Sequence, residues 1–141
     1  MDLTQAFPRS PRDKMAGLVH LPRMIDKIRA SHTGRLGPYM YPCPMDRMVL
    51  EFLGLSAEDL AARVRGAEDR RIEQDIEARC LARGLGGVEK SSLNHRILSH
   101  GPEPGEKTDY FMAERNRIDP SRTDIVTWAG LIDLEEGRAP L

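Results

Sequence analysis

The stretch Leu21-Pro22-Arg23-Met24-Ile25-Asp26-Lys27-Ile28 is the part of the chain that most clearly predicts the fold. Its apolar residues follow the i, i+3, i+4, i+7 spacing of one buried helix face, namely Leu21, Met24, Ile25 and Ile28. Pro22 suits a first helical turn, where its missing N–H removes no hydrogen bond. We therefore expect a helix over about residues 21–32, with one apolar face and one charged face.

The same spacing recurs on both sides of this stretch. Further helices are predicted to start at Ser10-Pro11, at Pro44 with a stop at Gly54, after Ser56, over 68–83, after Ser91 or Ser92, over 106–118, and at Thr123. Glycines and prolines crowd residues 33–43, which predicts a loop there. Because the chain has no strand-like alternation of useful length, we expect an all-α fold: an irregular single-domain bundle of about six helices over residues 1–141.

The apolar positions of these segments predict the core. The residues expected to be buried are Leu21, Ile25, Ile28, Met48, Val49, Phe52, Leu60, Ile76, Ile97, Phe111 and Trp128. Composition agrees with a packed interior, since 40% of the 141 residues are hydrophobic and 30% are charged.

The sequence shows neither a membrane-spanning stretch nor a secretory signal, and both features bear on the expected location of the protein. The longest uncharged stretches, such as Leu36 to Met45, have about half the length that a membrane-spanning helix needs. Met1 to Lys14 mixes acids, bases and prolines without an apolar segment, so no secretory signal is visible. We therefore expect a cytoplasmic protein that does not enter a membrane.

Charge is unevenly distributed along the chain. Residues 1–50 hold eight Lys or Arg against four Asp or Glu, and residues 51–141 hold thirteen against eighteen, for a net charge of −1. A basic N-terminal third is typical of an anion or nucleic-acid surface, or of a segment that folds back against an acidic body. The second interpretation is favoured, and nucleic-acid binding is not expected, because the overall balance is slightly acidic and aromatic residues do not alternate with basic ones.

Cysteine and histidine spacing indicates neither a metal site nor a redox pair. Cys43 and Cys80 lie 37 residues apart, and none of the four histidines has the spacing that places two imidazoles on one helix face. We therefore expect no metal and no cofactor. Cys43 stands just before Pro44, at the N-cap of a predicted helix whose dipole favours a thiolate. Asp46 in the same turn opposes that charge, so Cys43 is a candidate nucleophile or simply a small buried group, and Asp46 a capping residue.

The basic residues before and within the 21–32 helix form the main candidate binding site. His20, Arg23 and Lys27 are spaced by three and four residues, and Arg9 and Arg12 lie a short segment upstream. Arginine forks suit a phosphate or carboxylate. The alternative is a solvated face whose arginines pair with acids elsewhere in the chain. In the loop that follows, Tyr39 and Tyr41 are candidates for a pocket wall.

Several blocks of the sequence occur together in a recognisable order. They are Arg9 to Lys14 (RSPRDK), Leu21 to Lys27 (LPRMIDK), Tyr41 to Arg47 (YPCPMDR) and the C-terminal RTDIVTWAGLIDLEEGR that ends at Arg138. Together they resemble a bacterial family described only as a domain of unknown function, over nearly the full chain. The resemblance implies no activity, substrate or catalytic residue.

No motif of the chain is tied to one reaction, so whether it is an enzyme is not decided by the sequence. The leading hypothesis is a protein that binds a small anionic ligand through Arg9, Arg12, His20, Arg23, Lys27, Cys43 and Asp46. The alternative is an interaction module or a self-associating structural protein, a homo-oligomer whose seven methionines and basic face contact a partner.

Overall fold

Seven helices and one short hairpin make up residues 1–138, the part of the chain that the computed structural model describes. The elements are β1 (Lys14–Met15), β2 (Leu18–Val19), α1 (Leu21–His32), α2 (Pro44–Leu53), α3 (Ala57–Val64), α4 (Asp69–Ala82), α5 (Gly87–Leu98), α6 (Glu106–Ile118) and α7 (Trp128–Glu135). The two strands are antiparallel, with Lys14 opposite Val19 and Met15 opposite Leu18. The predicted class, an all-α single domain, is confirmed, although the described residues form seven helices where about six were expected and add a two-strand hairpin.

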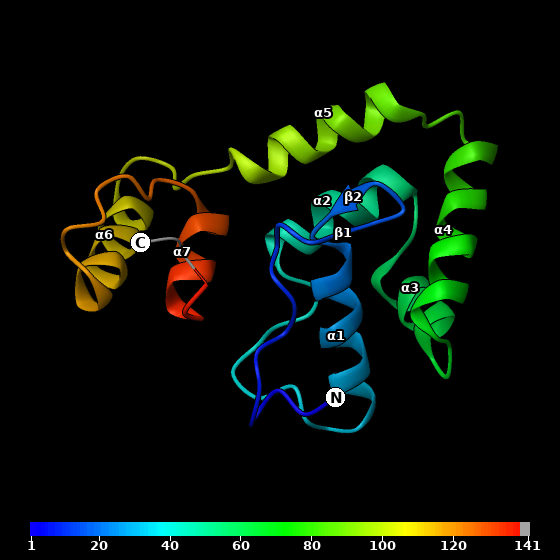
Figure 1. Cartoon of the computed structure of the whole chain (residues 1–141), viewed down its shortest axis with the longest axis horizontal. Helices are drawn as coiled ribbons and strands as arrows, with labels where there is room; N and C mark the ends of the chain where they lie inside the picture. Colours follow the sequence, from blue (N-terminus) through cyan, green and yellow to red (C-terminus); the bar gives the residue numbers. More distant parts are fainter. Residues whose placement is uncertain (139–141) are drawn as a thin grey trace.

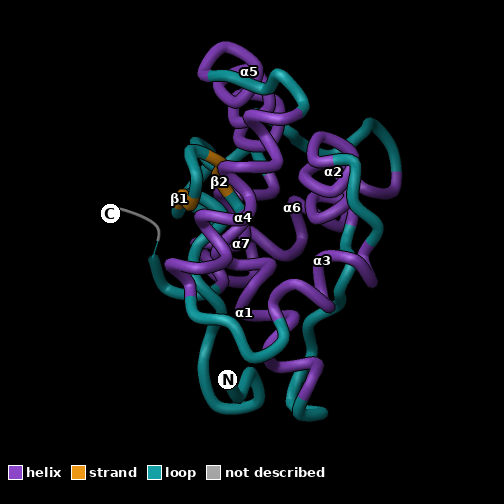
Figure 2. The backbone as a smooth tube through the Cα atoms, turned by 90° about the vertical axis from the view of Figure 1, so that its right-hand side faces the viewer, coloured by secondary structure: helices purple, strands orange, loops and turns teal. Residues whose placement is uncertain are grey.

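Helix α1 occupies the middle of the molecule. It contacts α2, α3 and β1, while α5 contacts α2, β2 and α7. Figure 1 shows α3 and α4 at one end of the molecule and α6 and α7 at the other, with α5 running along one edge between them. Figure 2, turned by 90°, keeps α5 at that edge and the N-terminal segment at the opposite one. The fold is thus a central helix enclosed by the other elements.

Two hydrophobic clusters hold this arrangement together. The larger one joins α1 to α2, α3, α4, α5 and the hairpin, and the smaller one consists of Phe111, Ile125 and Leu131. Trp128 packs against both clusters, and its ring meets that of Phe111 edge-on at 5.1 Å between centroids. Trp128 therefore links the α6–α7 end to the main body.

Helix α1 is buried on its charged side as well as its apolar side. Arg23, Asp26 and Lys27 are 4%, 5% and 3% exposed, so the predicted charged face is not solvated. Asp26 accepts from Arg9 of the N-terminal segment, and Arg23 pairs with Glu136 just after α7. Lys27 donates to Met40 of the 33–43 loop and to Asp46 of α2. A charged face is thus in the interior, where the loss of one partner of an ion pair costs far more stability than on a surface.

Helix starts follow the capping chemistry that the sequence indicates for α2 and α3. The Asp46 N–H donates to the Cys43 sulfur and the Cys43 N–H donates to the Asp46 carboxylate, which makes a reciprocal capping box. Ser56 and Asp59 repeat the arrangement at the start of α3. Gly54 ends α2 at a positive φ of 66°, as its position after the helix predicts.

The predicted helix start at Ser10-Pro11 is wrong. The segment is a turn followed by β1, and the Ser10 hydroxyl donates to Asp133 of α7 at 2.8 Å. The Ser10 hydroxyl also accepts the Arg12 N–H, and the Asp13 carboxylate accepts the Ser10 N–H, so local contacts typical of a helix start are made. After this turn, however, the chain pairs as β1 with β2.

Two other helix starts also differ from prediction. Helix α5 begins at Gly87 and not after Ser91 or Ser92, because the Glu89 carboxylate accepts the Gly86 N–H at 2.7 Å and starts the helix within the glycine-rich link. Helix α7 begins at Trp128, where Thr127 accepts the Gly130 N–H, and not at Thr123.

Most of the predicted core is confirmed. The buried members are Leu21, Ile25, Ile28, Val49, Leu60, Ile76, Ile97 and Phe111. Met48, Phe52 and Trp128 are only partly buried and pack against the edge of the larger cluster. Among the described residues, no helix reaches the length and apolar character needed to cross a bilayer.

Candidate functional site

A pocket of roughly 700 Å³ lies between α1, the end of the 33–43 loop and the α6–α7 pair. We call it the central pocket. Its lining consists of Phe7, His20, Arg23, Lys27, Pro38, Tyr39, Met40, Cys43, Pro44, Met45, His100, Lys107, Tyr110, Trp128, Leu131, Ile132, Glu135 and Glu136. The pocket thus opens where the two hydrophobic clusters meet, a common place for ligand sites.

Asp46 is the centre of a buried polar network beneath this pocket. One carboxylate oxygen lies 2.6 Å from His20 Nε2, and the other accepts from Lys27 Nζ at 2.6 Å and from the Cys43 N–H at 2.8 Å. Lys27 also donates to the Met40 carbonyl at 3.1 Å and lies 3.4 Å from Cys43 Sγ. Asp46 is therefore more than the capping residue that the sequence indicates.

The network fixes the charges of its members. Burial opposes ionisation of Asp46, but the His20 hydrogen bond and the Lys27 charge outweigh it and lower the pKa of Asp46 to about 2. Burial is also the largest effect on His20; it lowers the imidazole pKa despite the neighbouring carboxylate. At neutral pH the site therefore holds an ionised Asp46 and a neutral His20.

His20 is held in an uncommon conformation. It is the N-cap of α1 with φ 72° and ψ −23°, in the left-handed region that side chains other than glycine rarely adopt. Its backbone N–H donates to the Asp13 carbonyl, and its own carbonyl accepts from Met24. The ring is 1% exposed, and Nδ1 has no hydrogen-bond partner among the described residues.

Cys43 is an N-cap, as the sequence predicts, but the structure does not favour it as a nucleophile. Burial and the Asp46 charge raise the pKa of the Cys43 thiol, and the opposing effect of Lys27 is smaller. The neutral thiol accepts the Asp46 N–H at 3.4 Å. Its place in the network is therefore structural.

Arg23 forms a second buried ion pair at the pocket wall. Its two terminal nitrogens donate to the two Glu136 oxygens at 2.8 Å each, and one of them also donates to the Arg9 carbonyl. The Tyr39 hydroxyl donates to Glu136 at 3.1 Å, and the Tyr39 ring lies 5.4 Å from the Arg23 guanidinium carbon. Burial and the Glu136 charge raise the pKa of Tyr39 to about 12, so its hydroxyl stays a donor.

Arg9 and Arg12 are bound to acids outside the central pocket. Arg9 donates to Asp26 and Asp69, and Arg12 donates to Asp133. The favoured interpretation of the charge imbalance, a basic segment folded against an acidic body, agrees with these pairs. Four of the seven candidates, His20, Arg23, Lys27 and Cys43, line the pocket, and Asp46 is hydrogen-bonded to three of them; Arg9 and Arg12 do not line it.

Residues 5–138 match the family described as Domain of unknown function (DUF5069). The chain belongs to the DUF5069 family. The resemblance seen in the sequence blocks is thereby confirmed. No curated protein matches the chain.

The whole lining of the central pocket, from Phe7 to Glu136, lies inside the part of this DUF5069 protein that matches the family. Sequence reasoning missed Glu136 and the α6–α7 wall, and assigned Trp128 to the core alone. No local spacing signals these residues, because they lie about a hundred positions from α1. The one available signal is charge: the Glu135-Glu136 pair is acidic and the N-terminal third is basic.

The DUF5069 network also contains a set of metal-ligand atoms. One atom each from His20, Cys43 and Asp46 lies within 4.8 Å of the others. The Lys27 ammonium, however, lies 2.6 Å from one of these groups and 3.4 Å from another, and so already supplies the positive charge that a metal ion would bring. We therefore interpret the cluster as an ion-pair network of the protein and not as a metal centre.

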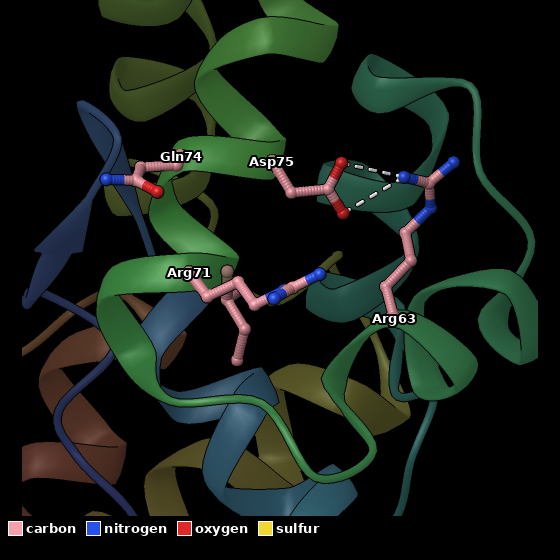
Figure 3. A pocket seen from close by; sticks show the side chains of 5 residues that line it. Arg63, Arg71, Gln74 and Asp75 are labelled. Carbon is pink, nitrogen blue, oxygen red and sulfur yellow. Dashed lines mark hydrogen bonds and ion pairs between the residues drawn. The ribbon is translucent and has the colours of Figure 1, made fainter.

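A second depression lies between α3 and α4 of the DUF5069 fold. Figure 3 shows Arg63 facing Asp75 across it, while Gln74 points to the other side of α4. Arg63 and Asp75 are 36% and 39% exposed at the side chain. An ion pair this exposed contributes little to stability, and none of the candidate residues lies here.

Proposed function

We propose that this DUF5069 protein binds a small organic molecule that has an apolar body and a carboxylate or similar anionic group. The single observation that carries the proposal is the central pocket, which gathers His20, Arg23, Lys27 and Cys43 beside an apolar wall. A concave site with a few convergent polar groups and perturbed pKa values is typical of a ligand site.

One cation of the pocket lining is available to an anion. Arg23, Lys27 and Lys107 line it against Glu135 and Glu136. Arg23 and Lys27 are already paired with carboxylates, whereas Lys107 makes no ion pair within the described residues. The first residues of α2 also line the pocket, where the helix dipole favours negative charge. Lys107 is therefore the proposed partner of the ligand's anionic group.

The apolar part of the pocket lining suits an apolar body. Its wall includes Met40, Tyr110, Trp128, Leu131 and Ile132. Met40 and Tyr110 are each 59% exposed, so apolar surface lies open at the mouth. A ligand that covered these side chains would gain about 25 cal/mol for each Å² of apolar surface removed from water.

Titration calorimetry and ligand-observed NMR with phenylacetate, 3-phenylpropionate and hexanoate test the proposal. We expect saturable binding that weakens at least tenfold in Lys107→Glu, because that change replaces the proposed anion partner with a repelling charge. Lys14→Glu is the matched control: Lys14 is exposed and does not line the pocket. Absence of binding by all three carboxylates, or equal loss in both variants, would contradict the proposal.

A second candidate, self-association, follows from the corner between α4 and α5. Leu81 and Val88, near the facing ends of these helices, are 83% and 80% exposed. Sedimentation velocity of the parent and of Leu81→Glu distinguishes the candidates. A parent dimer that Leu81→Glu dissociates supports self-association, and a monomer at high micromolar concentration rules it out.

A further inference from the structure

We infer that α6 is a lid of the central pocket, which opens by separating from α7 while the rest of the protein stays folded. Lys107 and Tyr110 of α6 line the pocket, so this separation removes part of one wall together with the proposed anion partner. The use of the opening for ligand entry rests on the proposed function, whereas the opening itself follows from contacts within the protein.

Helix α6 has few buried side chains. Of its 13 residues, Phe111 and Arg115 are buried, and the others are partly or fully exposed. Figure 1 shows the helix at one end of the molecule, where it packs against α7. Phe111 is the apolar member of this buried pair, and its ring meets that of Trp128 at 5.1 Å between centroids. A helix with so little buried surface separates at a lower free energy than α1, most of whose residues are buried.

Polar contacts do not attach α6 to the main body. Within residues 1–138, its side-chain hydrogen bonds and ion pairs all have partners between Glu103 and Ile125, on α6 itself or on its flanking loops. The α7 region, in contrast, is attached to the N-terminal segment and to α1 through Asp133 and Glu136. At this end of the molecule α7 is therefore fixed, and α6 is the helix that can move.

The second buried residue of α6 has a charge without a counter-ion. Arg115 is 8% exposed and forms no ion pair within the described part of the chain. Its guanidinium makes three hydrogen bonds of 3.4 Å, two to Asn116 and one to the Ile125 carbonyl, all longer than ordinary N–H···O bonds. Asp124 interacts with this charge at longer range but forms its ion pair with Arg122.

The unpaired charge of Arg115 favours the open position of α6. A buried charge without a compensating partner destabilises the arrangement that buries it. Separation of α6 from α7 returns the guanidinium to water and removes this penalty. Burial of Phe111 thus holds the lid closed, and burial of Arg115 opposes closure.

The segments on both sides of α6 suit a hinge. Residues 101–105 read Gly-Pro-Glu-Pro-Gly, and Gly105 has a positive φ of 110°. This link begins at a fixed point, since the His100 carbonyl accepts the Trp128 N–H at 2.9 Å. At the other end the helix stops before Asp119-Pro120. Because a helix does not continue through these prolines, α6 can move as a unit without disrupting α5 or α7.

Hydrogen–deuterium exchange of the free protein, followed by mass spectrometry, tests the inference. We expect the backbone amides of α6 to exchange about tenfold or more faster than those of α1 and α7, relative to their intrinsic rates. Exchange of α6 as slow as that of α1, or at the same rate as that of α7, would overturn the inference.

The variant Arg115→Met tests the cause of the opening. It keeps a long unbranched side chain but removes the charge, so it should slow exchange in α6 about fivefold or more and leave α1 unchanged. Arg117→Met is the matched control, because Arg117 lies on the same helix with 64% of its side chain exposed; it should change α6 exchange by less than about twofold. Faster α6 exchange in Arg115→Met would show that Arg115 holds the helix in place, which contradicts the lid.

Ligand binding supplies an independent readout. Saturating phenylacetate or hexanoate should slow exchange of α6 in the parent protein, because contact with Lys107 requires the closed position. Saturable binding that leaves α6 exchange unchanged overturns the lid and not the proposed function. Failure of the carboxylates to bind overturns the proposed function, and exchange of the free protein then decides by itself whether α6 opens.

Discussion

Arg23 and Glu136 face each other through two parallel hydrogen bonds of 2.8 Å, although 113 residues separate them in the chain. Their side chains are 5% and 6% exposed, so both charges are buried. This pair attaches the end of α7 to the central helix and closes one wall of the central pocket. Ser10 and Arg12 also bind Asp133, so the N-terminal segment is attached to α7 as well.

Removing one member of this pair should destabilise the protein strongly. Glu136→Gln leaves the buried Arg23 guanidinium without a compensating charge, and Arg23→Met leaves the Glu136 carboxylate with the more exposed Arg138 and the Tyr39 hydroxyl as its partners. Each is expected to lower the free energy of unfolding by about 3–5 kcal/mol, measured by urea denaturation.

The double variant Arg23→Met with Glu136→Leu is the matched control for that prediction. Because no unpaired charge remains, it should be more stable than either single variant by about 2 kcal/mol or more. Additive losses in the double variant would mean that the two charges do not interact as the structure indicates.

The buried state of His20 should make stability depend on pH in a defined window. Its pKa is lowered on folding, so below about pH 6.5 the unfolded chain binds a proton that the folded protein does not. Unfolding is therefore favoured as the pH falls below that value. We expect the free energy of unfolding to decline between about pH 6.5 and 5, and this decline to be smaller in His20→Gln.

His32→Gln is the control for this window, since burial also lowers the pKa of His32, which is less enclosed. Below about pH 4 a second loss is expected, because the pKa of Asp46 is about 2 in the folded protein against 3.8 ordinarily. Stability that is constant from pH 7 to 5 in the parent would show that His20 is not buried in its neutral form.

Local chemistry in the sequence predicts much of this fold. The α1 stripe, the Pro44 and Ser56 helix starts and the Gly54 stop each depend on neighbours within a few residues, and all are present in the structure. Where the chain pairs with a different segment, prediction fails. Ser10 is the example: its hydroxyl accepts the Arg12 N–H, as at a helix start, but it also donates to Asp133, and the chain continues as β1 paired with β2.

The candidate site likewise combines residues that local spacing predicts with residues that only the packing of distant segments brings in. His20, Arg23 and Lys27 are close in sequence, and helical spacing brings them to one pocket. Glu136 reaches that pocket only through the packing of α7, which no spacing within α7 encodes. The burial of these charged residues is also a tertiary effect. A charged stripe in the sequence does not reveal whether water or other side chains will cover it.

The buried aromatic ring with the largest effect on stability should be Phe111 and not Phe52. Phe111 is 2% exposed and packs edge-on against Trp128, whereas Phe52 lies at the margin of the larger cluster. Phe111→Ala is expected to cost about 3–5 kcal/mol and Phe52→Ala clearly less, because a partly exposed ring has less contact to lose. Thermal or urea denaturation of both variants provides the comparison, and an equal or reversed order would contradict the described packing.

Cys43 should behave as a helix cap and not as a reactive thiol. Its sulfur accepts the Asp46 N–H, and its raised pKa keeps it protonated at neutral pH. Cys43→Ala is therefore expected to cost about 1 kcal/mol through loss of the cap, and Cys43→Ser, which supplies a better acceptor, to be neutral or stabilising. Ser56→Ala, which removes the equivalent cap of α3, is the matched reference in the same denaturation experiment.

The role of Cys43 as a helix cap also predicts how reactive its thiol is. Alkylation requires the thiolate, so iodoacetamide should modify Cys43 in the folded protein at least tenfold more slowly than free cysteine at pH 7.5. Cys80 is buried and also has a raised pKa, so a Cys80→Ala variant isolates the rate of Cys43. A thiolate and a helix cap make opposite predictions for both measurements. If Cys43 is labelled faster than free cysteine and Cys43→Ala is as stable as the parent, Cys43 is a candidate nucleophile again.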